Sequence, residues 1–132
     1  MSKSILRYTF WSLSKLPFGL LYLLSDMLYV LIYHVFGYRK KIVFKNLRNS
    51  FPEKKEEEIQ LIAKKFYKKF PDLIVEAIKM ASITEQEVID RVELINTEEV
   101  YRHFDSGKGI ICVTSHYSNW EWGIHRLSFM TD

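Results

Sequence analysis

The sequence predicts an α/β fold, in which an N-terminal membrane-associated helix and a helical region lead into the first strands of an incomplete sheet. Three observations support this prediction. The first 38 residues are rich in apolar and aromatic side chains, helix-capping patterns recur through the middle of the chain, and the run Ile110–Thr114 is apolar and β-branched enough for a buried central strand. The expected order of strand, helix and strand near the end of the chain begins an α/β architecture.

The N-terminal segment has the length and the flanks of a membrane anchor. Leu16–Phe36 is long enough to span a bilayer. Its apolar residues contribute about −5 kcal/mol on an insertion scale, and Asp26 returns about +3 kcal/mol, so a free-standing span is marginal. One face is polar and aromatic with a 3.6-residue period, and it consists of Lys15, Gly19, Tyr22, Asp26, Tyr29 and Tyr33. Such a helix lies in the membrane interface or sits in lipid with that face against protein, and a core helix of a soluble protein is the alternative.

Charge and cysteine content narrow the classes of partner. The formal net charge is only +3, so bulk charge identifies no partner. A basic cluster follows the apolar segment and suits an anionic membrane surface; it consists of Arg39, Lys40, Lys41, Lys45 and Arg48. No recognisable nucleic-acid-binding fold surrounds this cluster, so we expect no nucleic-acid partner. Cys112 is the single cysteine; it makes neither a disulfide nor a metal site by itself, and we expect a small buried core residue.

The middle of the chain predicts several helices. Ser50 and Glu53 form a capping pattern that opens a helix, which Pro71 breaks or kinks before a second helix over residues 71–81. Thr84 and Glu87 form another capping pair. Residues 92–96 are a short strand candidate, Asn96 and Glu99 open a further short helix, and Gly107 and Gly109 mark the turn into the strand Ile110–Thr114.

The stretch "SHYSNWEW" places a histidine and a glutamate at the end of the expected strand. Ligands bind at the carboxyl ends of strands in open α/β sheets, and His116 stands at that end. Ser118 and Glu121 form a capping pattern, so a helix starts near Ser118 or Asn119 with Glu121 in its first turn. A carboxylate that reaches back to one ring nitrogen of His116 makes the other nitrogen a better base. The spacing alone also fits a simpler arrangement, in which Glu121 only caps the helix.

The same stretch resembles a known catalytic motif. "SHYSNWEW" is similar to the H-x4-D/E motif of glycerolipid-type acyltransferases, and most similar to the form found in lipid A biosynthesis (lauroyl and myristoyl) acyltransferases. "RKKIVFKNLRNSFPEKKEEE" is similar to the basic N-L-x-x-x-F-P-E segment of that family, and "GKGIICVTSHYSNWE" is similar to its G-K-G strand before the histidine. The resemblance runs from the anchor to about Gly123.

The resemblance implies a membrane enzyme that moves a fatty acyl chain to a hydroxyl of a lipid A-type glycolipid. It implies an acyl carrier protein thioester or acyl-CoA as co-substrate, no further cofactor and no metal, and a site at the inner membrane facing the cytoplasm. His116 is then the general base, Glu121 orients it, and Asn119 and Trp120 shape the substrate pocket. An apolar groove for the acyl chain is expected nearby.

The resemblance also implies two regions, a membrane anchor over residues 1–38 and the N-terminal part of an acyltransferase domain over 39–132. Family members are longer and carry later motifs, so we expect an N-terminal part that is inactive alone. A membrane-anchored scaffold without chemistry is one alternative. An acyltransferase with a different lipid acceptor is the other.

Overall fold

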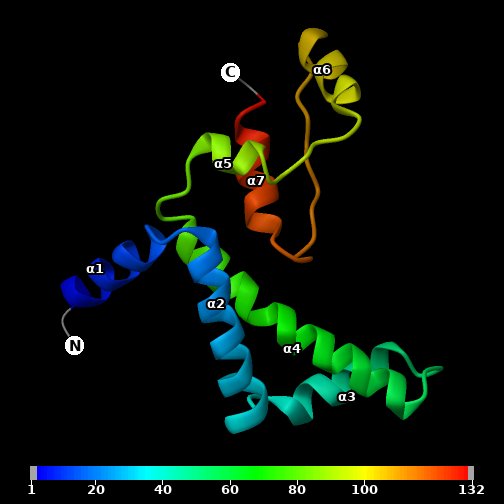
Figure 1. Cartoon of the computed structure of the whole chain (residues 1–132). Coiled ribbons are helices and arrows are strands. Elements are labelled where there is room, and N and C mark those ends of the chain that lie inside the picture. Colours follow the sequence, from blue (N-terminus) through cyan, green and yellow to red (C-terminus); the bar gives the residue numbers. More distant parts are fainter. Residues whose placement is uncertain (1–2, 131–132) are drawn as a thin grey trace. The chain divides into compact units, whose positions relative to one another are not determined.

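The regular structure of the described chain is helical. The computed structural model describes residues 3–130, and its elements are α-helices and one π-helical segment (Figure 1). These are α1 (Lys3–Ser14), α2 (Phe18–Tyr29), η1 (Val30–Val35), α3 (Lys40–Ser50), α4 (Glu56–Lys79), α5 (Glu85–Ile89), α6 (Thr97–Asp105) and α7 (Trp120–Ser128). Residues 3–130 contain no β-strand, so the predicted α/β fold class is wrong: the fold is all-helical.

Both expected strands are irregular segments in the structure. Residues 92–95 and 108–115 carry no regular structure, and Ile111 and Val113 are 91% and 93% exposed. A strand exists only when its backbone N–H and C=O groups pair with a neighbouring strand, and in the described part of the chain none lies beside residues 110–114. The β-branched residues of this segment favour an extended backbone, but the described chain offers no second strand with which they could form a sheet.

The chain divides after Ser82 into two compact units. In the described residues, unit 1 covers 3–82 and holds α1, α2, η1, α3 and α4, and unit 2 covers 83–130 and holds α5, α6 and α7. Helices α3 and α4 pack in the same unit as the N-terminal helices. The expected functional boundary at residue 38 stays a prediction.

Helix α4 is the central element of unit 1. Its buried positions recur every fourth residue, which gives one continuous stripe; they are Ile59, Ala63, Tyr67, Pro71, Val75 and Lys79. The predicted division into two helices at Pro71 is wrong, because α4 continues through it to Lys79. The alternative, a kink at Pro71, stays a prediction. Proline costs a helix one hydrogen bond, and burial of the Pro71 ring within the stripe offsets part of that cost.

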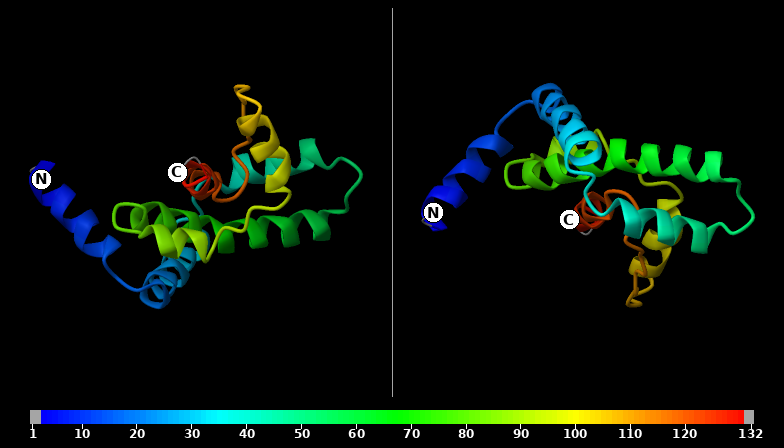
Figure 2. Two further views of the ribbon diagram at one scale, coloured as in Figure 1. Left: turned by 90° about the horizontal axis from the view of Figure 1, so that it is seen from above. Right: turned by 90° about the horizontal axis from the view of Figure 1, so that it is seen from below.

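The start of α4 also differs from the prediction. Ser50 is the last residue of α3, a helix that the sequence pattern did not predict, and α4 begins at Glu56. The Lys55 backbone N–H donates to the Glu58 carboxylate at 3.2 Å. Figure 2 shows α3 beside the first half of α4, where the Arg48 guanidinium donates two hydrogen bonds to the Glu56 carboxylate at 3.0 and 2.7 Å. These bonds lower the pKa of Glu56 and raise the pKa of Arg48.

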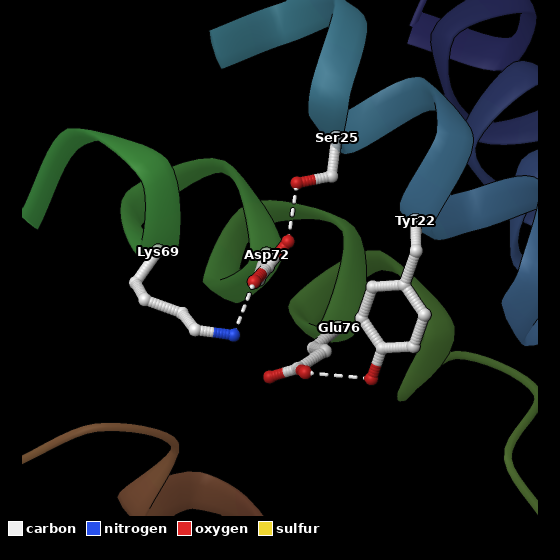
Figure 3. Close-up of polar contacts among 5 residues, drawn as sticks. All are labelled: Tyr22, Ser25, Lys69, Asp72 and Glu76. Carbon is white, nitrogen blue, oxygen red and sulfur yellow. Dashed lines mark hydrogen bonds and ion pairs between the residues drawn. The ribbon is translucent and has the colours of Figure 1, made fainter. Parts of the chain in front are cut away.

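Helix α2 packs on the second half of α4 through polar contacts. Tyr22 donates its hydroxyl proton to the Glu76 carboxylate at 2.9 Å, and Ser25 donates to Asp72 at 2.5 Å (Figure 3). Asp72 also pairs with Lys69 at 3.1 Å. Of the predicted polar face, Tyr22 contacts α4, whereas Asp26 is exposed.

Unit 2 consists of short helices with local caps. The predicted cap of α5 is confirmed, since the Thr84 hydroxyl accepts from the Glu87 N–H at 3.2 Å and the Glu87 carboxylate accepts from the Thr84 N–H at 2.9 Å. Helix α6 follows Asn96, which adopts a left-handed conformation (φ 59°) and caps no backbone group with its side chain. Gly107 ends the turn after α6 with φ 71°. Helix α5 packs against α7 (Figure 1).

Candidate active site

The segment that precedes α7 brings the predicted site residues to one end of that helix. Residues 108–115 run without regular structure, and the Tyr117 N–H then donates to the Ser115 carbonyl at 2.8 Å. Ser118 adopts φ 51°, which turns the chain into α7. The Asn119 side-chain oxygen accepts from the Trp122 N–H at 3.3 Å, so Asn119 is the N-cap. The predicted helix start is confirmed, but Asn119 rather than Ser118 caps it.

His116 lies against Trp120. The two rings meet edge to face, with centroids 4.5 Å apart and planes at 61°. His116 is exposed and Trp120 is half-buried. An aromatic neighbour restricts the orientation of the imidazole and leaves its nitrogens open to water or to a substrate.

Glu121 occupies the first turn of α7. Its negative charge lies at the positive end of the helix dipole, and the side chain is exposed. Among the described residues, no hydrogen bond or ion pair joins His116 to Glu121. Catalytic hydrogen bonds are often long in unliganded enzymes and tighten on substrate binding. The roles of His116 and Glu121 therefore stay predictions.

A large apolar cleft lies beside His116. Its volume is about 940 Å³. Its lining comes from α6, α7 and the segments around them, and consists of Leu94, Val100, Phe104, Ile110, Cys112, Val113, Thr114, Ser115, Tyr117, Trp120, Gly123, Ile124, Leu127, Ser128 and Met130. Cys112 is exposed at this lining, so the expectation of a buried core cysteine is wrong. His116 stands between two lining residues and contacts a third, Trp120.

Comparison with known protein families assigns the chain to an enzyme family. The family model described as bacterial lipid A biosynthesis acyltransferase matches residues 3–130. The chain belongs to this family. The match confirms the resemblance that the motifs around His116 indicated, and it assigns acyltransferase activity to the family in general. No curated protein and no solved structure matched the chain.

The family resemblance predicted an apolar groove near His116, but the sequence did not show which residues line the cleft. The motif predicted Trp120 in a pocket, and Trp120 lines the cleft. It did not predict the contributions of Val100 and Phe104 from α6 or of Ile124 from α7. The i, i+4 spacing of Val100 and Phe104 places them on one face of a helix, but this spacing does not show which part of the protein that face contacts. Asn119, predicted to shape the same pocket, caps α7 in this structure.

Proposed function

We propose that this protein transfers a fatty acyl chain to a hydroxyl of a lipid A-type glycolipid precursor, from an acyl carrier protein thioester or from acyl-CoA. The observation that supports the proposal best is the apolar cleft of about 940 Å³ beside His116. Apolar pockets of several hundred Å³ with a few polar groups at one end are typical of ligand sites. A fatty acyl chain has the shape and the apolarity that such a lining accepts.

The proposed chemistry needs one base. A ring nitrogen of His116 takes the proton of the acceptor hydroxyl as its oxygen attacks the thioester carbonyl carbon. The new C–O ester bond forms as the C–S bond breaks, and the leaving thiolate receives the proton back from the imidazolium. Glu121 orients the imidazole and stabilises its positive charge when the substrates draw the two side chains together. The step requires no metal and no cofactor besides the acyl donor.

Trp120 holds His116 at the cleft through the ring contact at 4.5 Å. In our proposal this contact sets the distance between the base and the carboxyl end of the acyl chain. Positioning of this kind contributes to rate because the reacting groups no longer have to find one another. We place the reaction at the inner membrane, on the cytoplasmic side, where the acyl carrier protein is available.

The test is acyl transfer in detergent from an acyl carrier protein thioester to a lipid A precursor, with the substitutions made in a full-length context. We expect His116→Ala to lower the rate by about 10²–10⁴-fold, as loss of a general base does. His103→Ala is the matched control, because His103 is also an exposed histidine of unit 2 and lies on α6, where it faces Glu99 at 3.6 Å. A rate near that of the unmodified chain for His116→Ala would refute the proposed role.

A further inference from the structure

We propose that α1 and α2 lie in the plane of an anionic membrane surface and do not cross the bilayer. The inference rests on the membrane location proposed above and specifies its geometry. Phe18–Val35 is the one helical stretch in the described residues that is long and apolar enough to cross a membrane, and only 11% of it is buried. Length and composition therefore allow both geometries, and the contacts of α2 decide between them.

Helix α2 has two opposite faces. Leu20, Leu23 and Met27 share one side of α2 with Val30 at the start of η1, and all four are exposed, with Leu23 and Met27 at 58% and 59%. The other side, with Leu21 and Ser25, is buried against α4. A helix with one apolar exposed face and one polar occupied face is suited to the boundary between lipid and water.

Helix α4 is tied to both ends of the apolar stretch. At one end the Lys79 ammonium donates to the Leu16 carbonyl at 3.4 Å, and in the turn after α4 the Ser82 hydroxyl donates to the Ser14 carbonyl at 2.6 Å. At the other end the Tyr67 hydroxyl donates to the Tyr38 carbonyl at 2.6 Å.

The contacts between these ends are also polar. They join Tyr22 to Glu76 and Ser25 to Asp72 (Figure 3). If α2 crossed the bilayer, residues 67–79 of α4 would cross with it. That segment carries ionisable side chains at every turn, namely Lys68, Lys69, Asp72, Glu76 and Lys79. Each charge near the centre of a bilayer offsets the insertion gain of several leucines.

The Asp26 side chain can reach water only if α2 lies in the plane of the membrane. It directly precedes Met27, so it lies about 100° around the helix from the middle of the apolar face. It is exposed, and no hydrogen bond or ion pair joins it to α4 within residues 3–130. In the plane of the membrane, Asp26 is at the water boundary. In a crossing helix it would lie halfway through the hydrocarbon.

The charges that follow the apolar segment in the sequence indicate an anionic lipid. Arg39, Lys41 and Lys45 are exposed and form no ion pair within the described residues, whereas Arg48 is paired with Glu56. On α1, Phe10 and Trp11 are exposed next to Arg7. Tryptophan prefers the headgroup level of a membrane, and clustered cations attract anionic headgroups.

The decisive experiment measures the depth of α2, residue by residue. The full chain with Cys112→Ser receives single cysteines at Leu20, Leu23, Asp26, Met27 and Val30, each carrying a nitroxide label, in vesicles of phosphatidylglycerol and phosphatidylcholine. In the flat geometry, contact with oxygen dissolved in lipid is high at Leu23 and Met27 and low at Asp26, with a 3.6-residue period. A single broad maximum near Asp26 would show a crossing helix and overturn the inference.

A second arm tests the charges and separates the inference from the proposed function. We expect Lys41→Gln with Lys45→Gln to weaken binding to the anionic vesicles by about 25-fold, at about fivefold for each charge. The matched control, Lys64→Gln with Lys65→Gln, changes the net charge equally on α4 and should weaken binding much less. Equal losses would overturn the contact with this surface. No binding of the unmodified chain to any vesicle would refute the membrane location itself.

Discussion

At the scale of single residues, Tyr67 links three segments of unit 1. It is 1% exposed, its hydroxyl donates to the Tyr38 carbonyl at 2.6 Å, and its ring lies 5.2 Å from that of Tyr33. Burial raises the pKa of Tyr67, because the phenolate would lose its hydration. One side chain thus joins α4 to η1 and to the turn before α3.

We expect Tyr67→Phe to lower the free energy of unfolding by about 1–2 kcal/mol at pH 7, since the Tyr38 carbonyl loses its partner. Because of the raised pKa, the Tyr67 hydroxyl stays protonated to a higher pH in the folded state than in the unfolded state. The contribution of Tyr67 is therefore complete below about pH 10 and is lost as the pH rises through the raised value. Urea unfolding followed by circular dichroism from pH 7 to pH 11 measures both effects.

Tyr8→Phe is the matched control, because Tyr8 lies in the same unit and is exposed. It should leave the free energy of unfolding and its pH dependence nearly unchanged. If Tyr67→Phe keeps the same alkaline loss of stability as the unmodified chain, Tyr67 is not its source.

At the candidate site, one prediction from the motif agrees with the structure and another does not. The motif identified His116 and Trp120, which the structure brings into ring contact, because four residues of chain across a turn restrict where both can go. It predicted Ser118 as a helix cap, yet Ser118 adopts a positive φ and Asn119 caps α7. Both are good capping residues, and the choice depends on the path of the preceding segment.

At the scale of elements, sequence patterns predicted correctly those features that depend on residues close together in the chain. The cap of α5 needs only Thr84 and Glu87, three residues apart, and it formed as predicted. The end of a helix at Pro71 is also a local prediction, but here tertiary packing prevailed. The burial of Pro71 in the stripe that faces the rest of unit 1 keeps α4 continuous.

We expect Pro71→Ala to raise the free energy of unfolding by about 1 kcal/mol. Proline inside a helix costs about 3 kcal/mol relative to alanine, whereas the loss of two buried methylene groups costs about 1.6 kcal/mol. Thermal and urea unfolding measure the balance. A destabilised variant would mean that the packing of the ring contributes more than the helix loses.

At the scale of the whole molecule, the apolar N-terminal segment and its partner helix form one amphipathic body. The insertion gain of Leu16–Phe36 is about −5 kcal/mol, and two charges such as Lys69 and Asp72 at the centre of a bilayer already cancel it at about 3 kcal/mol each. The sequence left the choice between spanning and interfacial geometry open, since it does not show which helix packs on α2.

The two units should differ in stability. In the described part of unit 2 the buried side chains are few, Val88, Trp122 and Met130, whereas unit 1 has the long buried stripe of α4. Small bodies with little buried surface are marginal. We expect amide hydrogens of α4 between Ala63 and Val75 to exchange at least tenfold more slowly than those of α6, by mass spectrometry on the full chain. Equal exchange would show that the units unfold together.

Sequence alone determined the family of this protein, most helices and the apolar character of its first segment, and it predicted His116, Asn119, Trp120 and Glu121 as site residues. These depend on motifs and on contacts within a few residues, which the chain specifies locally. Only the tertiary structure decided that residues 110–114 have no sheet partner in the described chain and that α4 passes through Pro71. It also decided which residues line the cleft beside His116 and that charged residues of α4 cover one face of α2. Each of these features depends on contacts between segments that are far apart in the sequence, and a local sequence pattern does not specify such contacts.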